Sequence, residues 1–326
     1  MGWKGTLRSM AAASRRAARE AEKRDRARRK RQEIEDAAET VSAFENYVEN
    51  LTKIHMDVET EYFDWQAVLE WPEPSQPEPV ETRQAKLRTK YESFSPHYVV
   101  EKLRMSDWVH RFLKWRLEKA IEKDLVETNE KIKAYTAELE HWREYTEIAR
   151  GLATKEAKSY LRAIELRNPL QKISALGSSI NIRIDDQNGF YVDLHVHGED
   201  VIPNEKYSLR KSGTLAVKNM PKGEYYALYQ DYVCSAVFRI SRELFALLPI
   251  KALVISAMDD LLNSATGHLE EQPLVSVFIP RDTAERLNWS HIDPSEALTN
   301  FNHNMQFRKT QGFSPTQVMA PSTECL

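Results

Sequence analysis

The chain has 326 residues, of which 29 % are charged and 41 % are hydrophobic, and its formal net charge is −3 at pH 7. This composition is typical of a folded protein, and two cysteines, Cys234 and Cys325, exclude a disulfide scaffold. No stretch approaches the ~18 uninterrupted apolar residues of a membrane span, and the N-terminus lacks the apolar core of a secretory signal. We therefore expect a cytoplasmic protein without a membrane partner.

The charge is concentrated in a basic segment at residues 1–31. This segment contains 12 Lys and Arg residues and three acids, a net charge of +9, so residues 32–326 sum to −12. A basic arm on an acidic body indicates a polyanionic partner. We predict non-specific binding of nucleic-acid phosphates, carried by Arg15, Arg16, Arg19, Arg24, Arg28, Arg29 and Arg31. The alternative is a solvated helix that binds nothing.

A heptad pattern follows and predicts a coiled-coil helix over residues 32–71. Its two rows of seam residues are Ile34, Val41, Val48 and His55, and Ala37, Phe44, Leu51 and Val58. Alternating spacings of three and four residues are typical of a coiled coil. Four prolines after Trp71 predict that the helix ends there, and that residues 72–97 form an extended acidic linker.

A second long helix is predicted over residues 98–168, with an interruption at Gly151. Its seam runs from Ile121 to Ala153 with the same spacing. Two matched seams joined by a linker favour an antiparallel hairpin within one chain. The alternative is an intermolecular coiled coil, which would make the protein an oligomer or bind another protein.

Residues 169–326 are predicted to form an α/β domain. Alternating residues 180–196 around a turn at 185–189 predict a β-hairpin, and a turn at 211–213 predicts a second one. Residues 225–248 are apolar except for a polar stripe with spacings of four, Asp231, Ser235, Arg239 and Glu243, which is typical of a central packing helix. Apolar runs at 252–255 and 274–279 predict buried strands, and Asp293-Pro294 predicts a helix start. The predicted fold class is thus α+β: a long N-terminal coiled-coil helical hairpin followed by a mixed-sheet α/β domain.

Asp193, His195 and His197 alternate along one predicted strand and therefore share a face. Two imidazoles and a carboxylate in this pattern can ligate zinc or iron. We favour the simpler interpretation, a solvent-facing row with no metal, and keep His195 and His197 as the candidate ligands. No cofactor is predicted.

A polar segment at residues 261–272 joins the two predicted buried strands. Its His268 and Glu270 are candidate catalytic residues, because long connections between core strands are often functional. No set of nucleophile, base and orienting group accompanies them, so the sequence names no reaction.

The order of elements over residues 155–290 is similar to that of the restriction-endonuclease-like (PD-(D/E)xK) nucleases. The resemblance implies an aspartate on the second core strand, which Asp193 matches, and Glu/Asp-x-Lys on the third. The third strand here reads Ala216-Val217-Lys218, so the lysine is present and the acid is not. One carboxylate binds Mg²⁺ poorly, which argues against catalysis at Asp193 and Lys218.

The whole chain also resembles a bacterial group that combines a start reading Gly2-Trp3-Lys4-Gly5-Thr6-Leu7-Arg8, a coiled coil and an α/β domain. The resemblance implies a bacterial cellular setting, but it does not identify an activity. We predict a non-enzymatic binding or scaffold protein that contacts nucleic acid through its arm and a macromolecule through its C-terminal domain. The alternative is a metal-dependent nuclease or hydrolase, with phage defence as its setting.

Overall fold

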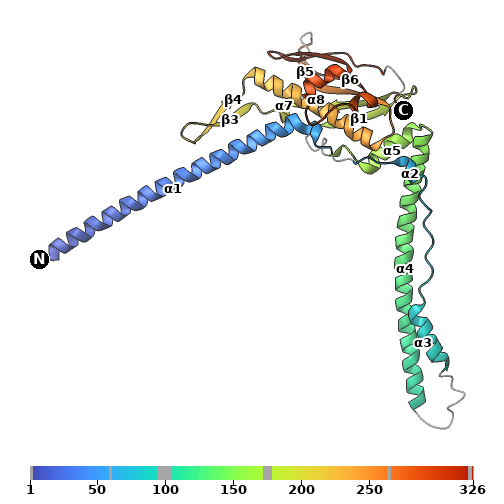
Figure 1. Cartoon of the computed structure of the whole chain (residues 1–326). Coiled ribbons are helices and arrows are strands. Elements are labelled where there is room, and N and C mark those ends of the chain that lie inside the picture. Colours follow the sequence, from blue (N-terminus) through green and yellow to red (C-terminus); the bar gives the residue numbers. More distant parts are fainter. Residues whose placement is uncertain are drawn as a thin grey trace. The chain divides into compact units, whose positions relative to one another are not determined.

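A computed structural model describes residues 3–58, 61–93, 105–171, 178–262, 266–321 and 325, without the side chains of residues 3–17, 93 and 105–107. The chain forms two compact units (Figure 1). One combines Met1–Phe63 with Ala163–Leu326, and the other is Asp64–Arg162. No helix in the described ranges has both the length and the apolar character needed to cross a membrane.

The Asp64–Arg162 unit is built along helix α4 (Met105–Ala153), against which α2 (Trp65–Val68) and α3 (Thr82–Ser93) pack. Asp124 of α4 is 1 % exposed and accepts hydrogen bonds from the backbone N–H groups of Arg83 (3.0 Å) and Gln84 (2.8 Å). It therefore caps the first turn of α3 from a neighbouring helix. The extended stretch before α3 is held by the indole N–H of Trp142, which donates to the carbonyl of Trp71 at 3.1 Å.

The predicted linker at 72–97 is wrong in its second half. The chain is extended up to Glu81, and α3 then occupies Thr82–Ser93, because no proline follows Pro79 until Pro96 and Asp124 caps this turn. Residues 94–97 lie outside the described part. The second long helix is confirmed where it is described: α4 ends at Ala153, two residues beyond Gly151, and α5 (Ala157–Arg167) follows.

The first long helix, α1 (Trp3–Lys53), ends earlier than Trp71, and a short 3₁₀ turn, η1 (Ile54–Met56), follows it. The prediction of a helix to Trp71 is wrong. Side chains of α8 bind the backbone carbonyls of Thr52, Ile54 and His55, which would otherwise be available to a further helical turn.

The seam of α1 packs on the sheet-bearing part of its own unit. Ala37, Val41 and Leu51 are buried, and α1 contacts α8, β3 and β4. The predicted coiled-coil hairpin with the second long helix is not confirmed. Heptad spacing specifies an apolar stripe along a helix, but it does not specify which element covers the stripe.

The main sheet has the order β1-β2-β5-β6-β7-β8, and only the β2–β5 pair is parallel. Its strands are β1 (Ser179–Ile184), β2 (Phe190–His195), β5 (Ala252–Leu262), β6 (Leu269–Pro280), β7 (Asn302–Arg308) and β8 (Gly312–Ser314). The mixed sheet, the β1–β2 hairpin and the two buried strands are confirmed, although β5 and β6 extend further toward their connection than predicted.

Between β2 and β5 the chain forms α7 (Gly198–Val201), a separate two-stranded ribbon of β3 (Glu205–Leu209) and β4 (Leu215–Asn219), and the central helix α8 (Lys222–Leu247). Most of α8 is buried, including Phe238 and Ile240 at 0 % exposure. This confirms the predicted packing helix.

After β6 come α9 (Arg281–Ala284), α10 (Pro294–Ala297) and a 3₁₀ turn, η3 (Leu298–Asn300). Asp293 caps α10, as predicted, by accepting from the backbone N–H groups of Ser295 and Glu296. Strands β7 and β8, which extend the sheet beyond β6, were not predicted from the sequence.

Candidate functional site

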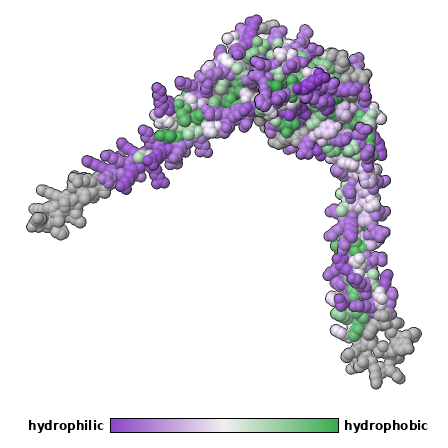
Figure 2. All heavy atoms as spheres, in the orientation of Figure 1, coloured by the Kyte–Doolittle hydropathy of each residue, from purple (hydrophilic) through white to green (hydrophobic). Residues whose placement is uncertain are grey.

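The described part of the basic arm is fully exposed. Every residue from Ala18 to Glu33 is exposed, and Figure 2 shows this part of α1 as hydrophilic. Within this described stretch, Arg26 forms an ion pair with Glu22 at 3.4 Å. The predicted phosphate-binding residues Arg19, Arg24, Arg28, Arg29 and Arg31 are exposed here, whereas the side chains of Arg15 and Arg16 lie outside the described part. The exposed guanidinium groups are therefore accessible to a ligand.

The C-terminal half of α1 holds the arm to the folded domain. Phe44 packs on Tyr207 of β3 with ring centroids 5.3 Å apart, and the hydroxyl of Tyr47 donates to the carbonyl of Val201 at 2.7 Å. At the turn of the ribbon, Gly213 has φ +81°, and a Cβ there would lie 3.2 Å from Cγ2 of Ile34. Because α1 is one continuous helix, this packing also orients the basic residues that precede Ile34.

The polar stripe of α8 forms hydrogen bonds with the backbone at the end of α1. The Ser235 hydroxyl accepts from the N–H of His55 (3.0 Å) and donates to the carbonyl of Thr52 (3.1 Å). Arg239 and Glu243 are 3 % and 0 % exposed and form an ion pair at 2.6 Å, while Arg239 also donates to the carbonyl of Ile54 at 3.3 Å. A buried pair with satisfied donors fixes local geometry. The stripe therefore has a structural role.

His55, the polar residue of the predicted seam, is 2 % exposed. Nδ1 of His55 lies 2.8 Å from the hydroxyl oxygen of Ser235, and the tautomer of the ring sets which of the two atoms donates. Nε2 of His55 makes no hydrogen bond with the described residues. Burial lowers the pKa of His55, so the ring is neutral at pH 7.

Asp231, the first residue of the stripe, has a different environment. Burial, together with the negative charge of Asp293, raises its pKa to about 6, and Lys309 opposes this shift. A carboxylate with a raised pKa is a frequent feature of functional sites, but structural groups show it as well. No catalytic partner for Asp231 is identified in the described structure.

The predicted solvent-facing row of Asp193, His195 and His197, in which the two histidines were the candidate metal ligands, is only partly formed. Asp193 lies 3.5 Å from Nε of Arg183, and Nδ1 of His195 is paired with a carboxylate oxygen of Glu271. The prediction is wrong for His197, because β2 ends at His195 and His197 adopts a left-handed backbone with φ 42°. In the ranges that the structure describes, no three His, Cys, Asp or Glu side chains are arranged to hold a metal ion.

The other candidate catalytic residues do not meet at one place. Lys218 lies on β4 of the ribbon, whereas Asp193 lies on β2 of the main sheet, next to β1 and β5. The predicted proximity of the two strands is wrong, because the β3–β4 ribbon pairs with itself and not with β2. His268 is exposed in the β5–β6 connection, and Glu270 accepts from the Thr266 hydroxyl at 2.8 Å.

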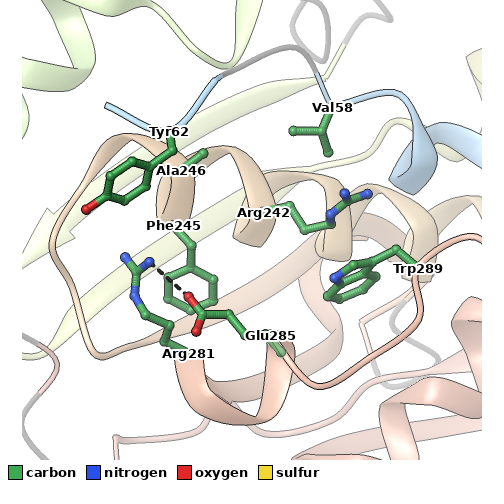
Figure 3. Close-up of a pocket in the computed structure, with 9 residues that line it drawn as sticks. Val58, Tyr62, Arg242, Phe245, Ala246, Arg281, Glu285 and Trp289 are labelled. Carbon is green, nitrogen blue, oxygen red and sulfur yellow. Dashed lines mark hydrogen bonds and ion pairs between the residues drawn. The ribbon is translucent and has the colours of Figure 1, made fainter. Parts of the chain in front are cut away.

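A pocket that the sequence did not predict lies beside the C-terminal part of α8. It is open to solvent on one side, has a volume of about 270 Å³ and is lined by side chains of α8, of the residues around α9 and of the segment after η1, among them Arg242, Phe245, Arg281, Glu285, Trp289 and Tyr62 (Figure 3). The guanidinium carbon of Arg242 lies 5.0 Å from the ring centroid of Trp289. The Arg281 guanidinium donates to the carbonyls of Ile250 (2.7 Å) and Leu248 (2.5 Å) and pairs with Glu285 at 3.3 Å.

A linear motif could not have revealed this pocket, because Arg242 and Trp289 are 47 positions apart. The one available signal in the sequence was Arg242 itself. It is a charged residue within an apolar helix, and it does not belong to the polar stripe.

Comparisons with protein-family models, with curated proteins and with solved structures found no match to this chain. The resemblances noted from the sequence therefore remain predictions, and the function has to be argued from the residues.

Proposed function

We propose that this chain is a non-enzymatic binding protein whose basic arm contacts nucleic-acid phosphates. The observation that supports this proposal is the exposed basic stretch of α1, which belongs to a helix anchored to the folded domain from Ile34 onward. Anchoring reduces the conformational entropy that a disordered basic tail would lose on binding.

The positions of the bases on the helix indicate how the arm would bind. At 3.6 residues per turn, Arg19, Lys23, Arg26 and Lys30 share one face, and Arg24, Arg28 and Arg31 share a second face about 140° around the helix. An α-helix fits the major groove of a DNA duplex, where phosphates lie on both sides of it. Two basic faces match two phosphate backbones, and contacts with phosphates alone carry no direct sequence information.

The enzymatic alternative is not proposed, because Asp193 and Lys218 lie on separate sheets. As the compartment we propose the cytoplasm. Cys234 and Cys325 are both buried and do not form a disulfide with each other, which suits a reducing environment.

The experiment is a binding titration by fluorescence anisotropy with labelled DNA duplexes of two unrelated sequences. The arm variant is Arg24→Glu/Arg28→Glu/Arg31→Glu, and the control makes the same charge change at exposed positions of α4, Lys123→Glu/Lys133→Glu/Arg143→Glu. We expect the arm variant to lose about tenfold or more in affinity for both duplexes, and the control to bind like the parent. Equal losses in the two variants would mean that net charge, and not the arm, determines binding.

A further inference from the structure

Arg242 forms no ion pair with any carboxylate of the residues that the structure describes. Its side chain is partly buried and donates one hydrogen bond, from Nη1 to the carbonyl of His55 at 2.5 Å. The nearby Glu243 is already paired with Arg239. Among the described residues, none places a carboxylate within ion-pair distance of Arg242. A partly buried guanidinium that makes one hydrogen bond with the described residues favours an incoming anion.

The rest of the pocket supplies a different chemistry. Arg281 is used by two backbone carbonyls and by Glu285, so this ion pair adds no net charge. Phe245 is 6 % exposed and, with Ala246 and Ala284, gives the pocket an apolar lining, while the exposed ring of Tyr62 (76 %) lies at its rim (Figure 3). The pocket thus combines the guanidinium of Arg242, which has no ion-pair partner among the described residues, with apolar and aromatic walls.

We propose that this pocket binds a small organic anion, whose carboxylate or phosphate pairs with Arg242 and whose apolar body contacts Phe245 and Ala246. The planar guanidinium offers parallel N–H groups that match either oxyanion. The volume of about 270 Å³ is close to the lower end of the range for ligand pockets. The pocket therefore fits a ligand with a single ring and one charged group. Burial and the positive charge of Arg239 lower the pKa of Arg242, the charge of Glu243 opposes this shift, and a bound anion would stabilise the charged guanidinium further.

The probes are benzoate, phenyl phosphate and uncharged benzyl alcohol, titrated into the full-length protein and followed by calorimetry and by protein-observed NMR. We expect saturable binding of benzoate or phenyl phosphate, with the tighter of the two identifying the preferred oxyanion, and weaker binding of benzyl alcohol. Arg242→Gln should weaken binding of the anion about tenfold or more, because a charge-assisted hydrogen bond is lost.

The matched control is Arg286→Gln, which removes an exposed arginine that does not line the pocket. It should bind the anion like the parent protein. Ala246→Phe fills the pocket without changing its charge and should also abolish binding, so the proposal stays testable if Arg242→Gln fails to fold. Duplex binding should be unchanged in Ala246→Phe, which separates this pocket from the arm. The proposal is overturned if neither anion binds saturably, or if folded Arg242→Gln and Ala246→Phe bind as Arg286→Gln does.

Discussion

Replacing Glu243 by Gln tests the buried ion pair that ties α8 to the end of α1. The substitution keeps the size of the side chain but leaves the guanidinium of Arg239, which is 3 % exposed, without its buried carboxylate. Removing one partner of a buried pair costs about 3–5 kcal/mol. We expect a loss near 3 kcal/mol, because Arg239 also lies 3.4 Å from the carboxylate of Asp57, which is 68 % exposed.

The free energy of unfolding is measured by urea denaturation followed by circular dichroism. Replacing both partners, in Arg239→Met/Glu243→Leu, should cost only about 1 kcal/mol, mainly because the carbonyl of Ile54 loses the Arg239 donor and keeps only the N–H of Asp57. Glu49→Gln is the control, since it breaks the exposed Lys53–Glu49 pair and should have no measurable effect. If Glu243→Gln is as stable as Glu49→Gln, the pair is not buried and the structural account of the stripe is wrong.

Three further predictions concern α8. Folding raises the pKa of Asp231 from 3.8 to about 6, so the stability it contributes when protonated is lost as the pH rises from about 4 to about 6. Asp231→Asn should therefore be more stable than the parent at pH 7 by about 1–2 kcal/mol, a value that is discounted because Asp231 is partly exposed. The gain in stability should vanish at pH 4, and an equal gain at both pH values would contradict this prediction. Phe238→Ala should lower the free energy of unfolding in urea by about 3–5 kcal/mol, because the ring of Phe238 is 0 % exposed and packs on Trp289 and Phe301. A loss below about 1 kcal/mol would mean that this site is loosely packed. Burial raises the pKa of the Cys234 thiol, so a thiol reagent should not modify it without denaturant, and rapid labelling detected by mass spectrometry would place it at the surface.

The parts of the fold that were predicted correctly are those whose signal is local. Alternation predicts the β1–β2 hairpin because one face of the strand is buried: Val192 and Leu194 are 0 % exposed, while the side chains of Asp193 and His195 are each 24 % exposed. The apolar circumference of α8 and the Asp293-Pro294 cap are likewise properties of a few adjacent residues. Such patterns need no knowledge of distant segments.

The errors arise where a distant segment decides the outcome. The helix at 32–71 ends at Lys53 because Ser235, Arg239 and Arg242 bind its last carbonyls, and these residues are more than 180 positions away. The same holds for the linker, where Asp124 caps a helix 40 positions before it. No periodicity within either segment contains this information.

The candidate site shows the same limit. The basic arm could be predicted from the sequence because charge is a property of each residue. The exposure of the arm could be predicted because the segment lacks an apolar face. The grouping of Asp193 with Lys218 required a strand order that the β3–β4 ribbon does not adopt. The pocket required Trp289 and Arg242 to meet through tertiary packing, which single-sequence patterns do not report.

The most direct test of the proposed function is the salt dependence of duplex binding, measured for the full chain and for Arg24→Glu/Arg28→Glu/Arg31→Glu. If the arm contacts phosphates, log K falls linearly with log salt concentration, with a slope of about 0.9 for each phosphate neutralised. The account predicts a slope of several units for the parent and a slope smaller by roughly two to three units for the variant. A parent whose affinity does not change with salt, or a variant with the same slope as the parent, would contradict it.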